Sequence, residues 1–246
     1  MRLDLSSYIS LERIPQRYYK PVNDFEKYTL SRYEKMPVRI NELADNAAIE
    51  IANDIVKHLK ASEAKNKKFV LGLSGGNSPQ RVFTELVRLH NEGGVSFKNM
   101  IVFNTYEFYP VTEPTLTSLH SIRESLLNLI DIEPNNIFSI DASIEKDLIA
   151  TKCEEYDQSL HKLGGLDYLL LGLGSKGNVG FNMPGTNLYS QTRLVILDGD
   201  SRRDIISGFE SLEKVPVSAI TMGLAGIMDA KKISLIAWGE QKAESL

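Results

Sequence analysis

A glycine loop with two hydroxyl residues, "SGGNSP" from Ser74 to Pro79, follows an apolar run of strand length. Gly75 and Gly76 let a ligand approach the backbone closely, and Ser78 and Pro79 suit the first turn of a helix, where Ser78 is predicted to cap. Free N–H groups at such a turn attract a phosphate. The alternative is a plain strand-to-helix turn, and a Walker A loop is excluded because its lysine is absent. The predicted phosphate-binding residues are Ser74, Gly75, Gly76, Asn77 and Ser78.

Two side chains with acidic protons, Tyr106 and Glu107, follow the next apolar run in "VFNTYEFYP". Only Glu107 is suited to general base chemistry near neutral pH, because an unperturbed tyrosine titrates at about pH 10. An ion pair or a loop hydrogen bond is an equally good interpretation of Glu107.

A second glycine-rich loop, "LGLGSKGNVGFNMPG" from Leu171 to Gly185, contains a single ionisable residue, Lys176. Its glycine spacing suits a backbone that bends against a ligand, but no acidic residue follows at the position that a dinucleotide site requires. Lys242, near the end of the sequence, could reach a phosphate at the first glycine loop or be a surface lysine.

The four histidines are His58, His90, His120 and His161. All fall near the ends of predicted helices or within them, and none is expected where a strand ends. Their scatter matches no metal-binding motif, so the sequence predicts no metal.

Apolar runs of strand length alternate with helical stretches along the rest of the chain. The predicted strands cover 69–73, 100–104, 137–141, 166–174, 193–198 and 233–239. Helices are expected near 79–91, 117–130, 144–162, 202–209 and 217–229, after a first one whose apolar stripe runs from Ala44 to Leu59. Strands that are apolar throughout lie in a sheet covered on both faces, which predicts a three-layer α/β/α sandwich with a mainly parallel, Rossmann-like sheet. Ligands then bind at the carboxyl ends of the strands.

Composition narrows the classes of partner. Twenty-eight basic and 32 acidic residues give a net charge of −4, so no positive field favours nucleic acid. The first residues lack the apolar core of a signal peptide and no run is long enough to span a membrane, which predicts a cytoplasmic protein without a membrane partner. The single cysteine, Cys153, lies in a predicted helix beside two glutamates. Their negative charge disfavours a reactive thiolate, so we expect Cys153 to be structural. Residues 1–35 are interpreted as an arm lying on the domain or on a partner, and residues 36–246 as one α/β domain.

The two glycine loops, the segment "SFKNMIVFNTYEFYP" and the segment "AITMGLAGIMDAKKISLIAWGEQKA" together resemble the glucosamine-6-phosphate deaminase family, which is related to the 6-phosphogluconolactonases. The resemblance implies cofactor-independent ring opening and aldose–ketose isomerisation of an amino-sugar phosphate with release of ammonia. It implies a small phosphorylated sugar as ligand and is compatible with a homo-oligomer. Because family members continue beyond the lysine motif, it also implies a chain that is shortened at its C-terminus or fused to another domain.

Four positions depart from the residues that the resemblance implies for proton transfer. Tyr106 stands where the family has the aspartate of an Asp-Glu pair, although Glu107 is retained. Lys176 and Asn178 replace the ends of an Asp-Gly-His segment, and Met183 replaces a glutamate. An amide and a thioether exchange no proton near neutral pH. Glu107 and Lys176 are therefore the only candidates for a reorganised relay, and the lactonase alternative fails at the same point because its histidine base also falls at Asn178.

The ligand-holding positions resemble the family better. The first glycine loop is similar to the phosphate loop of the lactonase branch, and Lys242 falls on the family's phosphate-contacting lysine. A second contact, an arginine, aligns near Ser207, where Arg202 or Arg203 could substitute. Two hypotheses follow: a divergent isomerase or deaminase that uses Glu107 and Lys176, and a catalytically silent phosphosugar-binding or scaffold domain of a larger protein.

Overall fold

A five-stranded parallel sheet forms the centre of the computed structural model, which describes residues 21–32, 36–111 and 113–246. The strands lie in the order β4, β2, β1, β5 and β8, and every neighbouring pair is parallel. Their bounds are β1 Phe69–Leu73, β2 Met100–Asn104, β4 Ile137–Phe138, β5 Tyr168–Gly172 and β8 Ile233–Ile236. All residues of β1 and β2 are buried, as the unbroken apolar runs predict.

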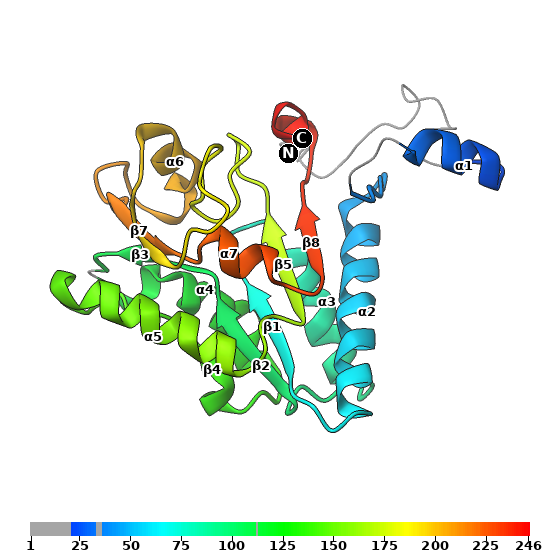
Figure 1. The fold of residues 1–246 in the computed structure, drawn as a ribbon, viewed down its shortest axis with the longest axis horizontal. Helices are drawn as coiled ribbons and strands as arrows, with labels where there is room; N and C mark the ends of the chain where they lie inside the picture. Colours follow the sequence, from blue (N-terminus) through cyan, green and yellow to red (C-terminus); the bar gives the residue numbers. More distant parts are fainter. Residues whose placement is uncertain (1–20, 33–35, 112) are drawn as a thin grey trace.

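Helices cover both faces of this sheet (Figure 1). The helices α2 (Ala44–Glu63), α3 (Gln80–Asn91) and α4 (Ser118–Ser125) pack on one face, in a core that contains Leu59, Phe83 and Ile122. The helices α5 (Ile149–Lys162) and α7 (Leu224–Met228) pack on the other, through Tyr156, Leu160 and Ile227. The predicted three-layer α/β architecture is confirmed.

A second, antiparallel sheet of three strands lies beside the main one, and the sequence did not predict it. It consists of β3 (Tyr106–Tyr109), β7 (Ser218–Thr221) and β6 (Arg193–Ile196), with β7 in the middle. The segment 106–109 was expected to be a loop, 193–198 a strand of the parallel sheet, and 217–229 one helix. These three predictions are wrong because a short apolar run carries no record of its partner strand, and because Gly223, in an extended conformation, separates β7 from α7.

Other boundaries differ from the prediction by a few residues or by a change of helix type. The remaining α-helices are α1 (Asp24–Ser31) and α6 (Gly199–Asp204). Short 3-10 helices occupy Pro114–Leu116, Leu127–Leu129, Pro134–Asn136, Lys146–Leu148, Ile206–Gly208 and Glu240–Ser245. They shorten the predicted helices at 117–130, 144–162 and 202–209, and only two residues of the predicted strand 137–141 form β4.

The described part of the N-terminal arm, residues 21–32, contains α1, which stands apart from the sheet beyond the N-terminal end of α2 (Figure 1). Phe25 and Tyr28 on this helix are exposed. Residues 1–20 and 33–35, which complete the predicted arm, lie outside the described residues. Among the described residues no helix has the length and apolarity that a membrane crossing requires, and no group of His, Cys, Asp and Glu side chains is arranged to hold a metal ion.

Cys153 lies buried on α5, where burial first and the charge of Asp157 second raise the pKa of its thiol to about 11. The two glutamates that follow in sequence are not the main cause, because burial removes the water that would stabilise the thiolate. We expect a thiol reagent at pH 8 to modify Cys153 on the order of a hundred times more slowly in the native protein than in urea, because little thiolate forms. A mass-spectrometric time course with iodoacetamide measures both rates, and equal rates would contradict the buried position.

Candidate functional site

The segments that follow β1, β2 and β8 meet at the carboxyl ends of these strands. The N–H of Gly75, after β1, donates to Oγ of Ser118, the first residue of α4, at 3.2 Å. Trp238, after β8, donates through Nε1 to the carbonyl of Ser78 at 2.7 Å. A Cβ placed on Gly76 would lie 3.5 Å from Oη of Tyr106, which follows β2. The structure therefore gathers the glycine loop, Tyr106 and the start of α4 around one point.

The glycine loop keeps several backbone donors unused. Among the described residues, the N–H groups of Gly76, Asn77 and Ser78 have no hydrogen-bond acceptor. Gly76 has a φ of +91°, which favours glycine. Ser78 does not cap α3 as predicted: Pro79 is the N-cap, without a side-chain hydrogen bond, and Ser78 packs against the backbone of Gly172 instead. The loop can still offer N–H groups to an anion at the start of α3.

Glu107 is buried and its carboxylate is fully engaged by N–H donors. Oε1 accepts from the N–H of Phe108 at 2.9 Å and of Ser118 at 2.6 Å. Oε2 accepts from the N–H of Leu119 at 3.0 Å and from Nδ2 of Asn104 at 3.4 Å. Burial raises the pKa of Glu107, and these donors oppose that shift. Of the two interpretations left open by the sequence, the structure displays the loop hydrogen bonds.

Tyr106 points to the opposite face of β3 from Glu107 and packs in an aromatic group. Its ring centroid lies 4.9 Å from that of Phe181 and 5.7 Å from that of Phe108, both in edge-on contact. Burial, with a contribution from the Glu107 charge, raises the pKa of Tyr106 above its ordinary value. The side chain beside Gly76 is therefore a neutral phenol at physiological pH.

The two asparagines of the second glycine loop donate hydrogen bonds to backbone carbonyls. Asn178 donates through Nδ2 to the carbonyl of Gly180 at 2.7 Å and fills the space beside Gly174. Asn182 donates through Nδ2 to the carbonyls of Val179 and Met222 at 3.1 and 2.8 Å. The side chains of Asn178 and Asn182 thus fix the backbone of the loop by hydrogen bonds.

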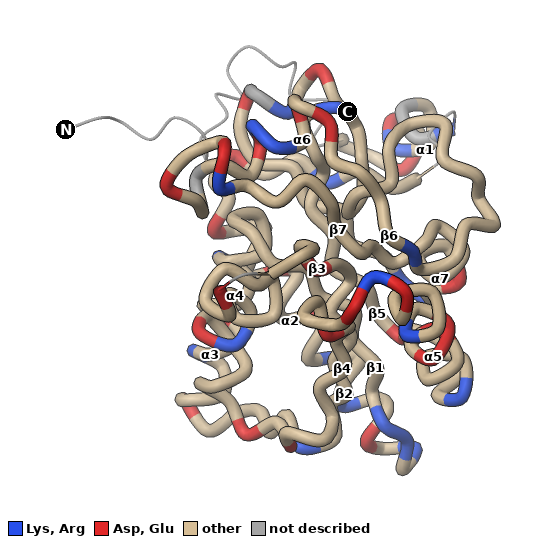
Figure 2. Tube along the Cα trace, turned by 90° about the vertical axis from the view of Figure 1, so that its left-hand side faces the viewer, with Lys and Arg blue, Asp and Glu red and all other residues tan. Residues whose placement is uncertain are grey.

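Lys176 and the two candidate arginines are engaged around α6, where basic and acidic residues are interspersed (Figure 2). Nζ of Lys176 lies 3.4 Å from Oδ2 of Asp200, and Arg203 pairs with the same carboxylate. Arg202 donates through Nη2 to the carbonyls of Leu212 and Val215 at 2.6 and 2.9 Å.

Met183 is half-buried, with its sulfur 3.9 Å from Oγ of Ser201 on α6.

Lys242 lies in the C-terminal 3-10 helix, which rests on the second glycine loop. Oγ of Ser245 in that helix donates to the carbonyl of Ser175 at 2.6 Å. Lys242 is half-buried, and its ammonium makes neither an ion pair nor a hydrogen bond within the described residues. It is therefore a cation available to an anionic ligand.

Comparison with known proteins places this arrangement in a family. The family model described as glucosamine-6-phosphate isomerases/6-phosphogluconolactonase matches residues 42–246. The chain belongs to this family. The resemblance stated from the sequence is confirmed.

Individual members of the glucosamine-6-phosphate isomerase/6-phosphogluconolactonase family support the assignment. A glucosamine-6-phosphate deaminase-like protein of Bacteroides thetaiotaomicron is 46% identical over 244 residues, which cover 99% of this chain and 37% of the relative. This chain thus spans little more than a third of that relative. The glucosamine-6-phosphate deaminase of Clostridium perfringens is 37% identical over 204 residues, which cover 82% of this chain and 80% of the relative.

Solved structures of the family share the fold. A monomeric glucosamine-6-phosphate deaminase superimposes with a TM-score of 0.71 at 30% identity, covering 81% of this chain and 80% of that chain. A 6-phosphogluconolactonase from Trypanosoma brucei superimposes with a TM-score of 0.68 at 20% identity, covering 86% and 85%, and supports the fold alone.

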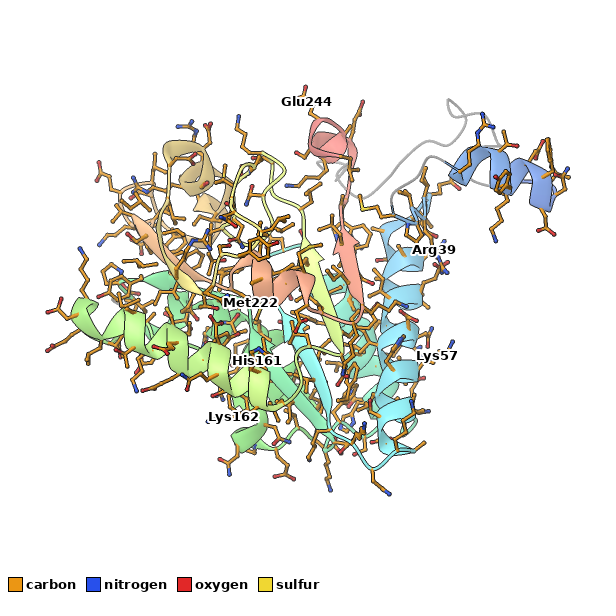
Figure 3. All side chains as sticks on the ribbon, in the orientation of Figure 1. Arg39, Lys57, His161, Lys162, Met222 and Glu244 are labelled. Atoms are coloured by element: carbon orange, nitrogen blue, oxygen red, sulfur yellow. The ribbon has the colours of Figure 1, made fainter. Side chains whose placement is uncertain are left out.

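Reasoning from the sequence missed three residues of this family member's site. Ser118 and Asn104 link the glycine loop to Glu107, and Thr117 caps α4 by accepting the N–H of His120 at 2.9 Å. The adjacent hydroxyl residues Thr117 and Ser118 at a predicted helix start were the available signal. His120 lies in the first turn of α4, whereas His161 lies at the C-terminal end of α5 (Figure 3).

A separate groove of about 930 Å³ lies between α5 and residues 191–194. Its lining includes Ile149, Cys153 and Leu194. None of the residues predicted for the site lines it.

Proposed function

We propose that this chain is a phosphosugar-binding member of its family in which the deaminase reaction of its relatives is lost. The proposal depends on the protonation and the contacts of the side chains at the substituted positions. Tyr106 is a neutral phenol, Asn178 is bonded to Gly180, and Lys176 is paired with Asp200. No group at these positions is free to carry a proton between adjacent carbons of a sugar.

Retention of ligand binding rests on groups that remain available. The N–H groups of residues 76–78 and the ammonium of Lys242 are not engaged by described residues. An anion at the start of α3 gains from the helix dipole and from charge-assisted hydrogen bonds. The relatives named as glucosamine-6-phosphate deaminases suggest a hexose 6-phosphate as the ligand.

The alternative of a divergent deaminase that uses Glu107 and Lys176 has weaker support. Glu107 has a raised pKa, as some general bases do, but each of its oxygens already accepts two hydrogen bonds. Lys176 is exposed and paired.

Calorimetric titration with glucosamine 6-phosphate, glucose 6-phosphate and inorganic phosphate tests the binding proposal. We expect the sugar phosphates to bind and Lys242→Ala to weaken them roughly 10- to 100-fold, because a hydrogen bond to a charged group contributes about 1.5–3 kcal/mol. Lys57→Ala, which removes an exposed lysine on α2, is the matched control and should bind as wild type does (Figure 3). Absence of binding by the wild-type protein, or equal affinities for the two variants, would overturn the proposal.

A further inference from the structure

The N-termini of two helices, α3 and α4, lie beside Gly75. Only at α4 do side chains of the protein accept hydrogen bonds from the first N–H groups of the helix. On α4 the N–H groups of Ser118 and Leu119 donate to Glu107, and that of His120 donates to Oγ1 of Thr117. A buried carboxylate therefore occupies the position that an anionic ligand would take at α4. On α3 the N-cap provides no side-chain acceptor.

The carboxylate of Glu107 is connected to the glycine loop by an unbroken set of hydrogen bonds. Its N–H donor Ser118 uses Oγ twice, donating to Oδ1 of Asn104 at 3.1 Å and accepting from the N–H of Gly75 at 3.2 Å. Asn104 closes the set through Nδ2, which contacts Oε2 of Glu107 at 3.4 Å and donates to Oγ of Ser139 at 3.1 Å. Gly75, Asn104, Glu107 and Ser118 are all buried, and Ser139 is half-buried.

Steric fit makes this connection stiff. A Cβ on Gly75 would lie 2.6 Å from Oγ of Ser118 and 3.1 Å from its carbonyl oxygen. Gly75 therefore has no space to move toward α4, and a shift of Ser118 moves the acceptor of the Gly75 N–H. The three N–H groups without an acceptor, those of residues 76–78, follow Gly75 directly in the chain.

We infer that Glu107 is a positioning residue that fixes α4 and, through Ser118 and Asn104, sets the orientation of the glycine loop for its ligand. The inference rests on the proposed phosphosugar binding for its effect on affinity, but its effect on the loop exists without ligand. It gives Glu107 a role that requires a carboxylate and no proton transfer. Glu107→Gln replaces one acceptor oxygen by an NH₂ group that faces N–H donors, so it breaks the set with little change of volume.

Two measurements on the full chain test the inference. The first is amide hydrogen exchange of residues 74–78 without ligand, for wild type, Ser118→Ala and Glu107→Gln. We expect both variants to exchange the Gly75 amide at least ~10-fold faster, because its acceptor is lost or displaced. The second is the dissociation constant for glucose 6-phosphate, which we expect to rise ~5-fold or more in each single variant. In the double variant we expect it to rise by no more than ~2-fold beyond the larger single effect, because the two residues act in one set of contacts.

Asp131→Asn is the matched control. Asp131 also ties separate segments, accepting from the N–H of Phe97 at 2.6 Å and from Oγ of Ser96 at 2.7 Å, but it does so at the opposite end of the sheet, before β2 begins. We expect it to lower the melting temperature without changing loop exchange or affinity. Unchanged exchange at Gly75 in Ser118→Ala or in Glu107→Gln, or the same exchange rate in Asp131→Asn as in those variants, would overturn the inference. If wild type binds no sugar phosphate, the proposed function fails, and the exchange measurement still decides the role of Glu107.

Discussion

Glucosamine 6-phosphate incubated with this protein is expected to release ammonia at less than about 10⁻⁴ of the rate of a deaminase relative, because loss of a general acid or base costs 10²–10⁴-fold and several proton-handling positions are exchanged at once. In the structure, two of the replacing side chains are also bonded to other groups of the protein. Asn178 is bonded to Gly180 and Lys176 lies in an ion pair with Asp200, so both side chains already contact other groups of the protein.

An enzymatic ammonia assay measures this prediction, with the Clostridium perfringens deaminase as the positive control. Binding of the same sugar phosphate must be measured in the same buffer, so that absence of turnover is separated from absence of ligand. Turnover within about 100-fold of the control, lost in Glu107→Gln that remains folded, would establish the divergent deaminase instead.

Truncation of Glu107 is expected to lower the stability of the protein strongly. Glu107→Ala leaves the N–H groups of Phe108, Ser118 and Leu119 without their acceptor in a buried site. Since each of the three buried donors left unsatisfied costs about 1–3 kcal/mol, we expect the free energy of unfolding to fall by roughly 3–9 kcal/mol. That is a large part of the ~5–15 kcal/mol that stabilises a typical protein.

Urea unfolding followed by circular dichroism measures this loss. Glu113→Ala, which changes an exposed glutamate six residues along the chain, is the control and should stay within about 0.5 kcal/mol of wild type. A loss below about 1 kcal/mol for Glu107→Ala would contradict the hydrogen bonds described for its carboxylate.

Strands β1 and β2 of the parallel sheet were predictable because all their residues are buried and nearly all of them are apolar. Phe69–Leu73 and Met100–Asn104 were located to the residue in this way. The antiparallel sheet was not predictable, because Tyr106 pairs with Thr221 and Arg193 pairs with the same residue across large separations in sequence. Short strands of this kind are specified by the partners that they meet, which local periodicity does not record.

The sequence by itself determined the family and the exchange of its proton-handling residues, because both depend only on which residue types follow which strands. Tertiary structure alone decided what those residues do. Glu107 became a capping carboxylate because the start of α4, eleven residues further along, folds back over β3, and Lys176 became an ion-pair partner because α6 brings Asp200 to it. A side chain's chemistry is set by the donors, charges and water around it, and those neighbours come from distant segments that only folding brings together.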